Sequence, residues 1–247
     1  FMINIKDDEK INRSKPYEYS VKSWKKWCEK NDVIFFILDE YIFDKNYLIP
    51  NWYKLYVFDL LDNQGIDYDQ IAVVDADTIV HPDCPNFFDL SEHKFCAVHN
   101  DGSYDWVCRS LENYSKHVFS DFTFPVWEYI NSGFLILNKK HKQLYKDIID
   151  FYFTNRDLLI EVQNNFAVGN DQPIINFFLH KENIDLKLLS YKFNMQDMAN
   201  KEILDENLTF TKLGWIYHYN AIPNNENSEL TLYWMKKTYE ELYDNIS

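Results

Sequence analysis

Glycine, proline and arginine are scarce in this chain of 247 residues. It has only 5 Gly and 7 Pro, which argues against flexible linkers, internal repeats and low-complexity segments. Its arginines are Arg13, Arg109 and Arg156, so bidentate arginine clamps on phosphate groups cannot be numerous. The formal net charge of −14 excludes a general polyanion binder, because such binding depends on lysine and arginine neutralising phosphates.

The cysteines and the apolar runs exclude further classes. Cys28, Cys84, Cys96 and Cys108 show no CxxC spacing, so neither a zinc site nor a disulfide framework is expected, and free thiols in a reducing cytoplasm are the expectation. No run reaches the ~18 apolar residues of a membrane span. We expect the natural chain to start at Met2, without a secretory signal, and to be located in a bacterial cytoplasm or, if viral, in that of the host.

Apolar residues make up 46% of the chain and aromatic residues 18%, which is ample for one large domain over residues 1–247. The first half predicts strands and helices in alternation. The expected segments are a strand at 2–6, a helix at 16–30, a strand at 33–38, a helix at 51–63 and a strand at 71–74. This β-α-β-α-β order predicts an α/β fold with a mostly parallel sheet flanked by helices.

The second half is less regular. The expected strands cover 95–98, 134–137 and 215–219, and the expected helices cover 139–154, 172–181 and 232–242. Residues 99–130 are expected to form a loop region over the site, where Tyr104, Trp106, Trp127 and Tyr129 are either an acceptor wall or plain core. The predicted organisation is a nucleotide-binding half, 2–98, and an acceptor and donor-sugar half, 99–247.

The segment IAVVDADTIV, residues 71–80, carries the strongest chemical signal. A buried strand delivers Asp75 to the carboxyl edge of the sheet, and Asp77 can lie on the same side if the chain stays extended. Two carboxylates separated by one small residue, Ala76, suit Mg²⁺ or Mn²⁺ that already carries phosphate oxygens. The alternative is that one aspartate is a turn residue and the other an exposed cap.

Two enzyme classes place such a pair after a strand. Haloacid-dehalogenase-type phosphatases use the first aspartate of DxDxT as nucleophile, and Gly169-Asn170-Asp171 resembles their acidic metal loop. However, two predicted βα units precede Asp75, and residues 161–168, EVQNNFAV, make a poor strand before that loop. GT-A glycosyltransferases instead use DxD to hold Mn²⁺ on a nucleotide-sugar diphosphate. A third possibility is a protein that binds nucleotide sugars without catalysis.

The ordered segments VVDADTIV, NSGFLILN, NDQPIIN, YKFN and IYHYNA resemble the nucleotide-diphospho-sugar transferases. They are most similar to the glycogenin and lipopolysaccharide galactosyltransferase group, glycosyltransferase family 8. The resemblance implies a GT-A fold with a smaller acceptor-side region. It also implies sugar transfer, with retention, from a nucleotide-diphosphate donor, expected to be a UDP-sugar, to the hydroxyl of a glycan or lipid-linked saccharide. A hydroxylated nucleic-acid base is a less favoured acceptor, and the oligomeric state is open.

The resemblance also implies a metal and nucleotide site. Mn²⁺, or Mg²⁺, is held by Asp75 and Asp77 of the DxD, with Ala76 between them, and His218 completes the metal shell. His218 could instead be a core histidine between two tyrosines. The chain departs from the family after His218, because HYNAIPN lacks the glycine and the lysine-proline-tryptophan element that bind the diphosphate.

The donor-sugar contacts implied by the resemblance lie in the second half. The NxG segment, Asn131, Ser132 and Gly133, lines the sugar, and Asp171 and Gln172 lie beside the sugar and the reacting carbon as the catalytic pair. The first three residues could also be only a turn before a strand. Asp171 could be the N-cap of its helix, with Pro173 in the first turn, which is compatible with a sugar contact.

Overall fold

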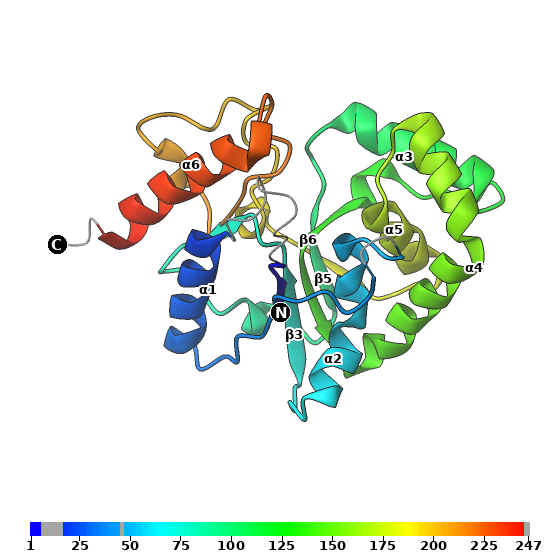
Figure 1. The fold of residues 1–247 in the computed structure, drawn as a ribbon, viewed down its shortest axis with the longest axis horizontal. Coiled ribbons are helices and arrows are strands. Elements are labelled where there is room, and N and C mark those ends of the chain that lie inside the picture. The colour runs from blue at the N-terminus through cyan, green and yellow to red at the C-terminus, as the bar shows by residue number, and fades with distance from the viewer. Residues whose placement is uncertain (6–16, 45–46, 245–247) are drawn as a thin grey trace. The chain divides into compact units, whose positions relative to one another are not determined.

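The computed structural model describes residues 1–5, 17–44 and 47–244, and these form two compact units. Unit 1 consists of Phe1–Tyr47, Val74–Leu90 and Ser190–Ser247. Unit 2 consists of Leu48–Val73 and Ser91–Leu189. Figure 1 shows the helices and strands of both.

Unit 1 contains two small groups of strands. β1 (Met2–Ile3) pairs in parallel with β2 (Ile37–Leu38), and Met2 also pairs in parallel with Val74, the last residue of β3 (Gln70–Val74). β4 (Thr78–Val80) pairs antiparallel with β8 (Ile216–His218). The helical elements are α1 (Glu18–Lys30), η2 (Phe87–Leu90), η5 (Tyr191–Phe193), η6 (Thr209–Lys212), η7 (Glu226–Ser228), α6 (Glu229–Tyr239) and the π-helical turn η8 (Glu240–Asp244).

Helix α1 is fixed to the β4 region through its two tryptophans. The Trp27 ring stacks on Phe87 with centroids 4.4 Å apart, and both side chains are almost fully buried. The Trp24 indole N–H donates to Thr78 Oγ1 over 2.9 Å. Because buried indoles bring a large apolar area and one directional donor, this contact holds the start of β4, directly after the DxD, in a defined place.

Unit 2 contains four strands in the order β3-β6-β5-β7. β5 pairs antiparallel with β6, with a register shift between Ala97 and Val98, and pairs in parallel with β7. All residues of β6 are buried, and α5 packs on it and against α3 and α4 (Figure 1). The elements are η1 (Pro50–Tyr56), α2 (Val57–Asn63), β3 (Gln70–Val74), β5 (Phe95–His99), α3 (Tyr104–His117), η3 (Val126–Glu128), β6 (Ile130–Asn138), η4 (Lys139–His141), α4 (Lys142–Phe166), α5 (Asp171–Lys181) and β7 (Leu186–Leu189).

The predicted α/β class with a mostly parallel sheet is confirmed, since β1 pairs in parallel with β2 and with β3, and β5 pairs in parallel with β7. The pair β5–β6 and the separate pair β4–β8 are antiparallel. Residue 6, in the first predicted strand, and residue 16, in the first predicted helix, lie outside the described part of the chain. The strand predicted at 33–38 is confined to β2, and β4 and β7 were not predicted. None of the helices within the described ranges has the length and hydropathy needed to span a bilayer.

The predicted loop region at 99–130 is wrong, because α3 occupies much of it. Val107, Ser110, Leu111 and Tyr114 are its buried residues, which is the spacing of one helix face. Ser110, in the middle of that face, interrupts the apolar pattern, and for this reason the sequence did not indicate the helix. The predicted helix at 139–154 also continues as α4 to Phe166, with a kink at Asn155.

The four cysteines are free, as predicted. Burial raises the pKa of the Cys28 and Cys96 thiols to about 11, so both stay protonated at neutral pH.

Candidate active site

The two aspartates of the DxD lie in the short turn that connects β3 to β4. The chain turns at Ala76 and Asp77, so the extended backbone considered for this segment is not what brings the carboxylates together. The Thr78 hydroxyl donates to Asp75 O over 2.7 Å and accepts the bond from Trp24. This arrangement closes the turn and fixes its exit into β4.

His218 reaches the same place because of the register between β4 and β8. Thr78 pairs with His218, and Tyr219 N donates to Asp77 O over 2.9 Å. Side chains alternate along a strand, so Tyr217 and Tyr219 enter the core on one face while His218 points to the other. The His218 ring therefore faces the two aspartates, on the side opposite the tyrosine core.

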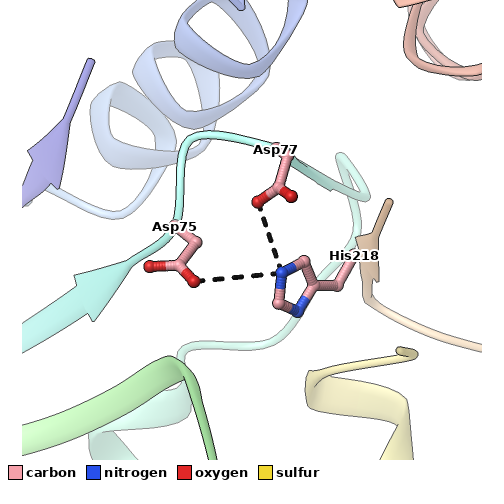
Figure 2. Close-up of side chains that lie close together, drawn as sticks. All are labelled: Asp75, Asp77 and His218. Atoms are coloured by element: carbon pink, nitrogen blue, oxygen red, sulfur yellow. Dashed lines mark ion pairs between the residues drawn. The ribbon is translucent and has the colours of Figure 1, made fainter. Parts of the chain in front are cut away.

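Figure 2 shows the three side chains converging. His218 Nε2 lies 3.3 Å from Asp77 Oδ1 and 3.9 Å from Asp75 Oδ2. One ligand atom from each residue can be chosen so that all lie within 4.8 Å of one another. The His218 side chain is only 4% exposed, whereas those of Asp75 and Asp77 are 34% and 25% exposed, so the cluster has a closed side and an open side.

The chemistry of this donor set fits a divalent metal ion. Two carboxylates and an imidazole are ligands that Mn²⁺ accepts. Three such acceptor atoms facing one another repel unless a proton or a cation lies among them. Of the described residues, only Asp75, Asp77 and His218 form a group of this kind. The structure thus brings together the predicted metal residues, with Ala76, 9% exposed, between the two carboxylates.

Asn194 orients the histidine. Its Oδ1 lies 3.0 Å from His218 Nδ1, and its side chain is fully buried. Because an amide oxygen only accepts, a ring proton on Nδ1 satisfies this contact, and Nε2 is the nitrogen that faces the carboxylates. The backbone supports this contact, since Met195 N donates to Ile216 O and His218 N donates to Met195 O. The YKFN segment singled out in the sequence is therefore the support of the histidine.

We expect Asn194→Leu to weaken Mn²⁺ binding by about 10- to 100-fold, the usual effect of removing the hydrogen-bond partner of a metal-bound histidine. Asn194→Asp retains an acceptor for Nδ1 and should stay close to the native affinity. Titration calorimetry with Mn²⁺ measures both variants. Equal affinity of Asn194→Leu and the native chain would show that Asn194 does not orient the ligand.

A second polar cluster lies in unit 2, between β6 and the start of α5. Asp171 is the first residue of α5, and Asn170 is the N-cap, so the reading of Asp171 as the cap is wrong. The Ser132 hydroxyl donates to Asp171 Oδ2 over 3.3 Å, and Ser132 N donates to Gln172 Oε1 over 2.9 Å. The predicted NxG segment and the predicted catalytic pair are thus in direct contact.

Lys54 is a member of this cluster that the sequence reading missed. Its Nζ lies 3.0 Å from Asp171 Oδ2, and the two side chains are 5% and 6% exposed. It also donates to Ser132 O and Oγ, each over 3.3 Å. A buried ion pair contributes little net stability, so its presence beside polar groups points to a binding role. The sequence feature that could have indicated Lys54 is that it is the single charged residue in the apolar and aromatic run WYKLYVF.

Asn100 was also missed, and it connects the cluster to β5. Its Oδ1 accepts from Asn131 Nδ2 over 3.0 Å and from Gln172 Nε2 over 3.3 Å. Asn131 Oδ1 accepts from Gly133 N over 2.9 Å, so the segment is held inside β6 and is not merely a turn before a strand. These contacts fix the amide groups of Asn131 and Gln172 in one defined orientation.

No protein-family model matches the chain, and no curated protein matches it in sequence. Solved structures do match its fold, and glycosyltransferases are among them. The expected GT-A glycosyltransferase fold is therefore confirmed.

The individual neighbours are distant in sequence. A glycosyltransferase involved in the glycosylation of the major capsid of PBCV-1 is 12% identical over 96% of this chain and 98% of that chain, with a TM-score of 0.60. An active-site mutant of LgtC is 13% identical over 98% of this chain and 96% of its own, with a TM-score of 0.53. The bifunctional glycosyltransferase WbbM is 14% identical over 97% of this chain and 51% of its own, with a TM-score of 0.50.

Proposed function

We propose that this protein is a metal-dependent glycosyltransferase that moves a sugar from a nucleoside-diphosphate donor to an acceptor hydroxyl. The observation that carries the proposal is the convergence of Asp75, Asp77 and His218 on one point in a glycosyltransferase fold. We further propose Mn²⁺ as the metal, a UDP-sugar as the donor and a glycan as the acceptor. The solved neighbours support the general reaction through the fold they share with this chain.

The metal cluster would act on the leaving group. A divalent cation supplies Lewis-acid chemistry, neutralising the charge that develops on the departing diphosphate. Asp75 and Asp77 would hold it with carboxylate oxygens, and His218 would hold it with Nε2. Their backbones are fixed by the turn and by β8, so the site needs little reorganisation to bind.

The polar cluster of unit 2 would bind the donor sugar. Lys54, Ser132 and Gln172 offer N–H and O–H donors, and Asp171 offers carboxylate oxygens, which together suit the hydroxyl groups of a pyranose. Asp171 and Gln172 remain the proposed catalytic residues. Their oxygens would stabilise positive charge at the anomeric carbon, as preorganised dipoles do. We also propose that the transfer retains the anomeric configuration, because the acceptor hydroxyl attacks the same face of the sugar that the diphosphate leaves.

A thermal-shift panel tests the donor class. UDP, GDP, CDP and ADP are each added with Mn²⁺ and with EDTA, and a ligand that binds only the folded chain raises the midpoint. We expect a rise with UDP in Mn²⁺, about 2.7 kcal/mol of stabilisation at a hundredfold excess over Kd, and none in EDTA. No rise with any nucleotide would refute the proposal. Release of phosphate from a model ester in a manner dependent on Asp75 would favour the phosphatase.

A further inference from the structure

The structure separates Tyr104, Trp106, Trp127 and Tyr129 into two kinds. Tyr129 is fully buried, and the Trp106 ring meets it edge-on with centroids 6.4 Å apart. Tyr104 and Trp127 are instead 63% and 67% exposed. Helix α3, which starts at Tyr104, packs against η3, which contains Trp127. Two large exposed rings therefore belong to adjoining elements of unit 2.

The turn that carries Trp127 is firmly held. Glu128 N donates to Pro125 O over 2.9 Å, and Tyr129 N donates to Val126 O over 3.2 Å. The Glu128 carboxylate lies 3.5 Å from His180 Nδ1. The backbone that carries Trp127 is thus fixed, so binding a ligand on this ring does not require the turn itself to be ordered.

Both elements are connected by side-chain and backbone contacts to the polar cluster of unit 2, which binds the donor sugar in the proposed function. On the η3 side, Asn100 N donates to Tyr129 O over 2.8 Å, and Asn100 Oδ1 accepts from the Gln172 amide. On the α3 side, the Trp106 ring covers Gly169 so closely that a Cβ there would lie 2.5 Å from Trp106 Cζ2. Gly169 is two residues before Asp171.

We propose that Trp127 and Tyr104 form an acceptor subsite that stacks the ring of a neutral saccharide; this inference rests on the proposed function. Aromatic faces stack on the apolar C–H faces of pyranoses, and carboxylates accept bonds from their hydroxyl groups. Asp101, Asp105 and Glu128 lie beside the two rings in sequence and are at least partly exposed. These carboxylates would repel a phosphate backbone, so a saccharide fits better than a nucleic-acid base.

Saturation-transfer NMR on the full chain tests the subsite with defined probes: lactose and the methyl glycosides of glucose, galactose and mannose. We expect at least one probe to receive saturation, with affinity at least fivefold weaker in Trp127→Ala and in Tyr104→Ala. Trp127→Phe, which keeps a stacking ring, should stay within about twofold of native. Tyr233→Ala removes a ring that is 42% exposed in unit 1 and should change nothing. Midpoints of thermal unfolding confirm that each variant is folded.

The inference is overturned if no saccharide receives saturation, or if Trp127→Ala binds as the native chain does. It is also overturned if a 12-nucleotide single strand binds through Trp127 while no saccharide does. The nucleotide thermal-shift panel is run on the same samples. A metal-dependent nucleotide shift without saccharide binding refutes the subsite alone, whereas saccharide binding through Trp127 without a nucleotide shift supports the subsite and refutes the donor assignment.

Discussion

Asp77→Asn is expected to abolish metal-dependent nucleotide binding and to lower sugar transfer by about a thousandfold. The substitution keeps the shape of the side chain and the backbone bond that Asp77 O accepts from Tyr219, but it removes one of the two proposed anionic ligands. A metal ion contributes several kcal/mol to the stabilisation of a leaving group, and each 1.36 kcal/mol is a factor of ten in rate. Titration calorimetry with Mn²⁺ and a nucleotide-release assay measure the two effects.

The matched control is Asp83→Asn, the same chemical change in the same unit. The Asp83 side chain is 73% exposed and pairs only at the surface with Lys30, 3.3 Å away. Its replacement should leave Mn²⁺ affinity and turnover within about twofold of native, because exposed pairs contribute little. Equal behaviour of the two variants, with metal binding retained in both, would contradict the assignment of Asp77 as a ligand.

Lys54→Met is expected to lower the free energy of unfolding by about 3–5 kcal/mol, because it leaves the buried carboxylate of Asp171 without its partner. For a chain of this size the unfolding midpoint should fall by about 2–4 °C per kcal/mol. The double variant Lys54→Met with Asp171→Asn removes both charges and should recover most of that loss. Chemical denaturation measures the stability of all three chains.

Activity separates a binding role of this pair from a structural one. Sugar transfer should be lost in the single and in the double variant, even where stability is recovered. Lys142→Met is the control, since Lys142 pairs with Asp62 at the surface. Its replacement should lower the free energy of unfolding by about 0–1 kcal/mol and leave sugar transfer unchanged. A double variant that is both stable and active would show that the Lys54–Asp171 pair only supports the fold.

The proposed metal-binding cluster could be predicted from the sequence because its parts have strong local signals. A buried strand followed by two carboxylates predicts an edge site, and IYHYNA shows a histidine between two core aromatics. What the sequence could not supply is the register. Thr78 opposite His218, more than a hundred residues away in the chain, follows from the antiparallel pairing of β4 and β8, and β4 itself is too short to be predicted.

The unit 2 cluster shows a different limit of sequence reading. Asp171 and Gln172 were predicted because they belong to a recognisable motif. Lys54 and Asn100 are single polar residues, and only their tertiary contacts show that they belong to the cluster. Burial decides between a solvated lysine and a site residue, and burial is a property of the packed chain. In the same way, Ser110 on the buried face of α3 obscured that helix, although tertiary packing accommodates it.

Nucleotide release from sugar donors, measured with Mn²⁺ and with EDTA, is the most direct test of the central claim. The native chain and Asp77→Asn are incubated with UDP-glucose, UDP-galactose, UDP-N-acetylglucosamine and GDP-mannose, together with the saccharide probes. We expect the native chain to release UDP from at least one donor in Mn²⁺, with at least a hundredfold less release in EDTA and in the variant. Release that is absent for every donor, or equal in the native chain and Asp77→Asn, would contradict a metal-dependent glycosyltransferase.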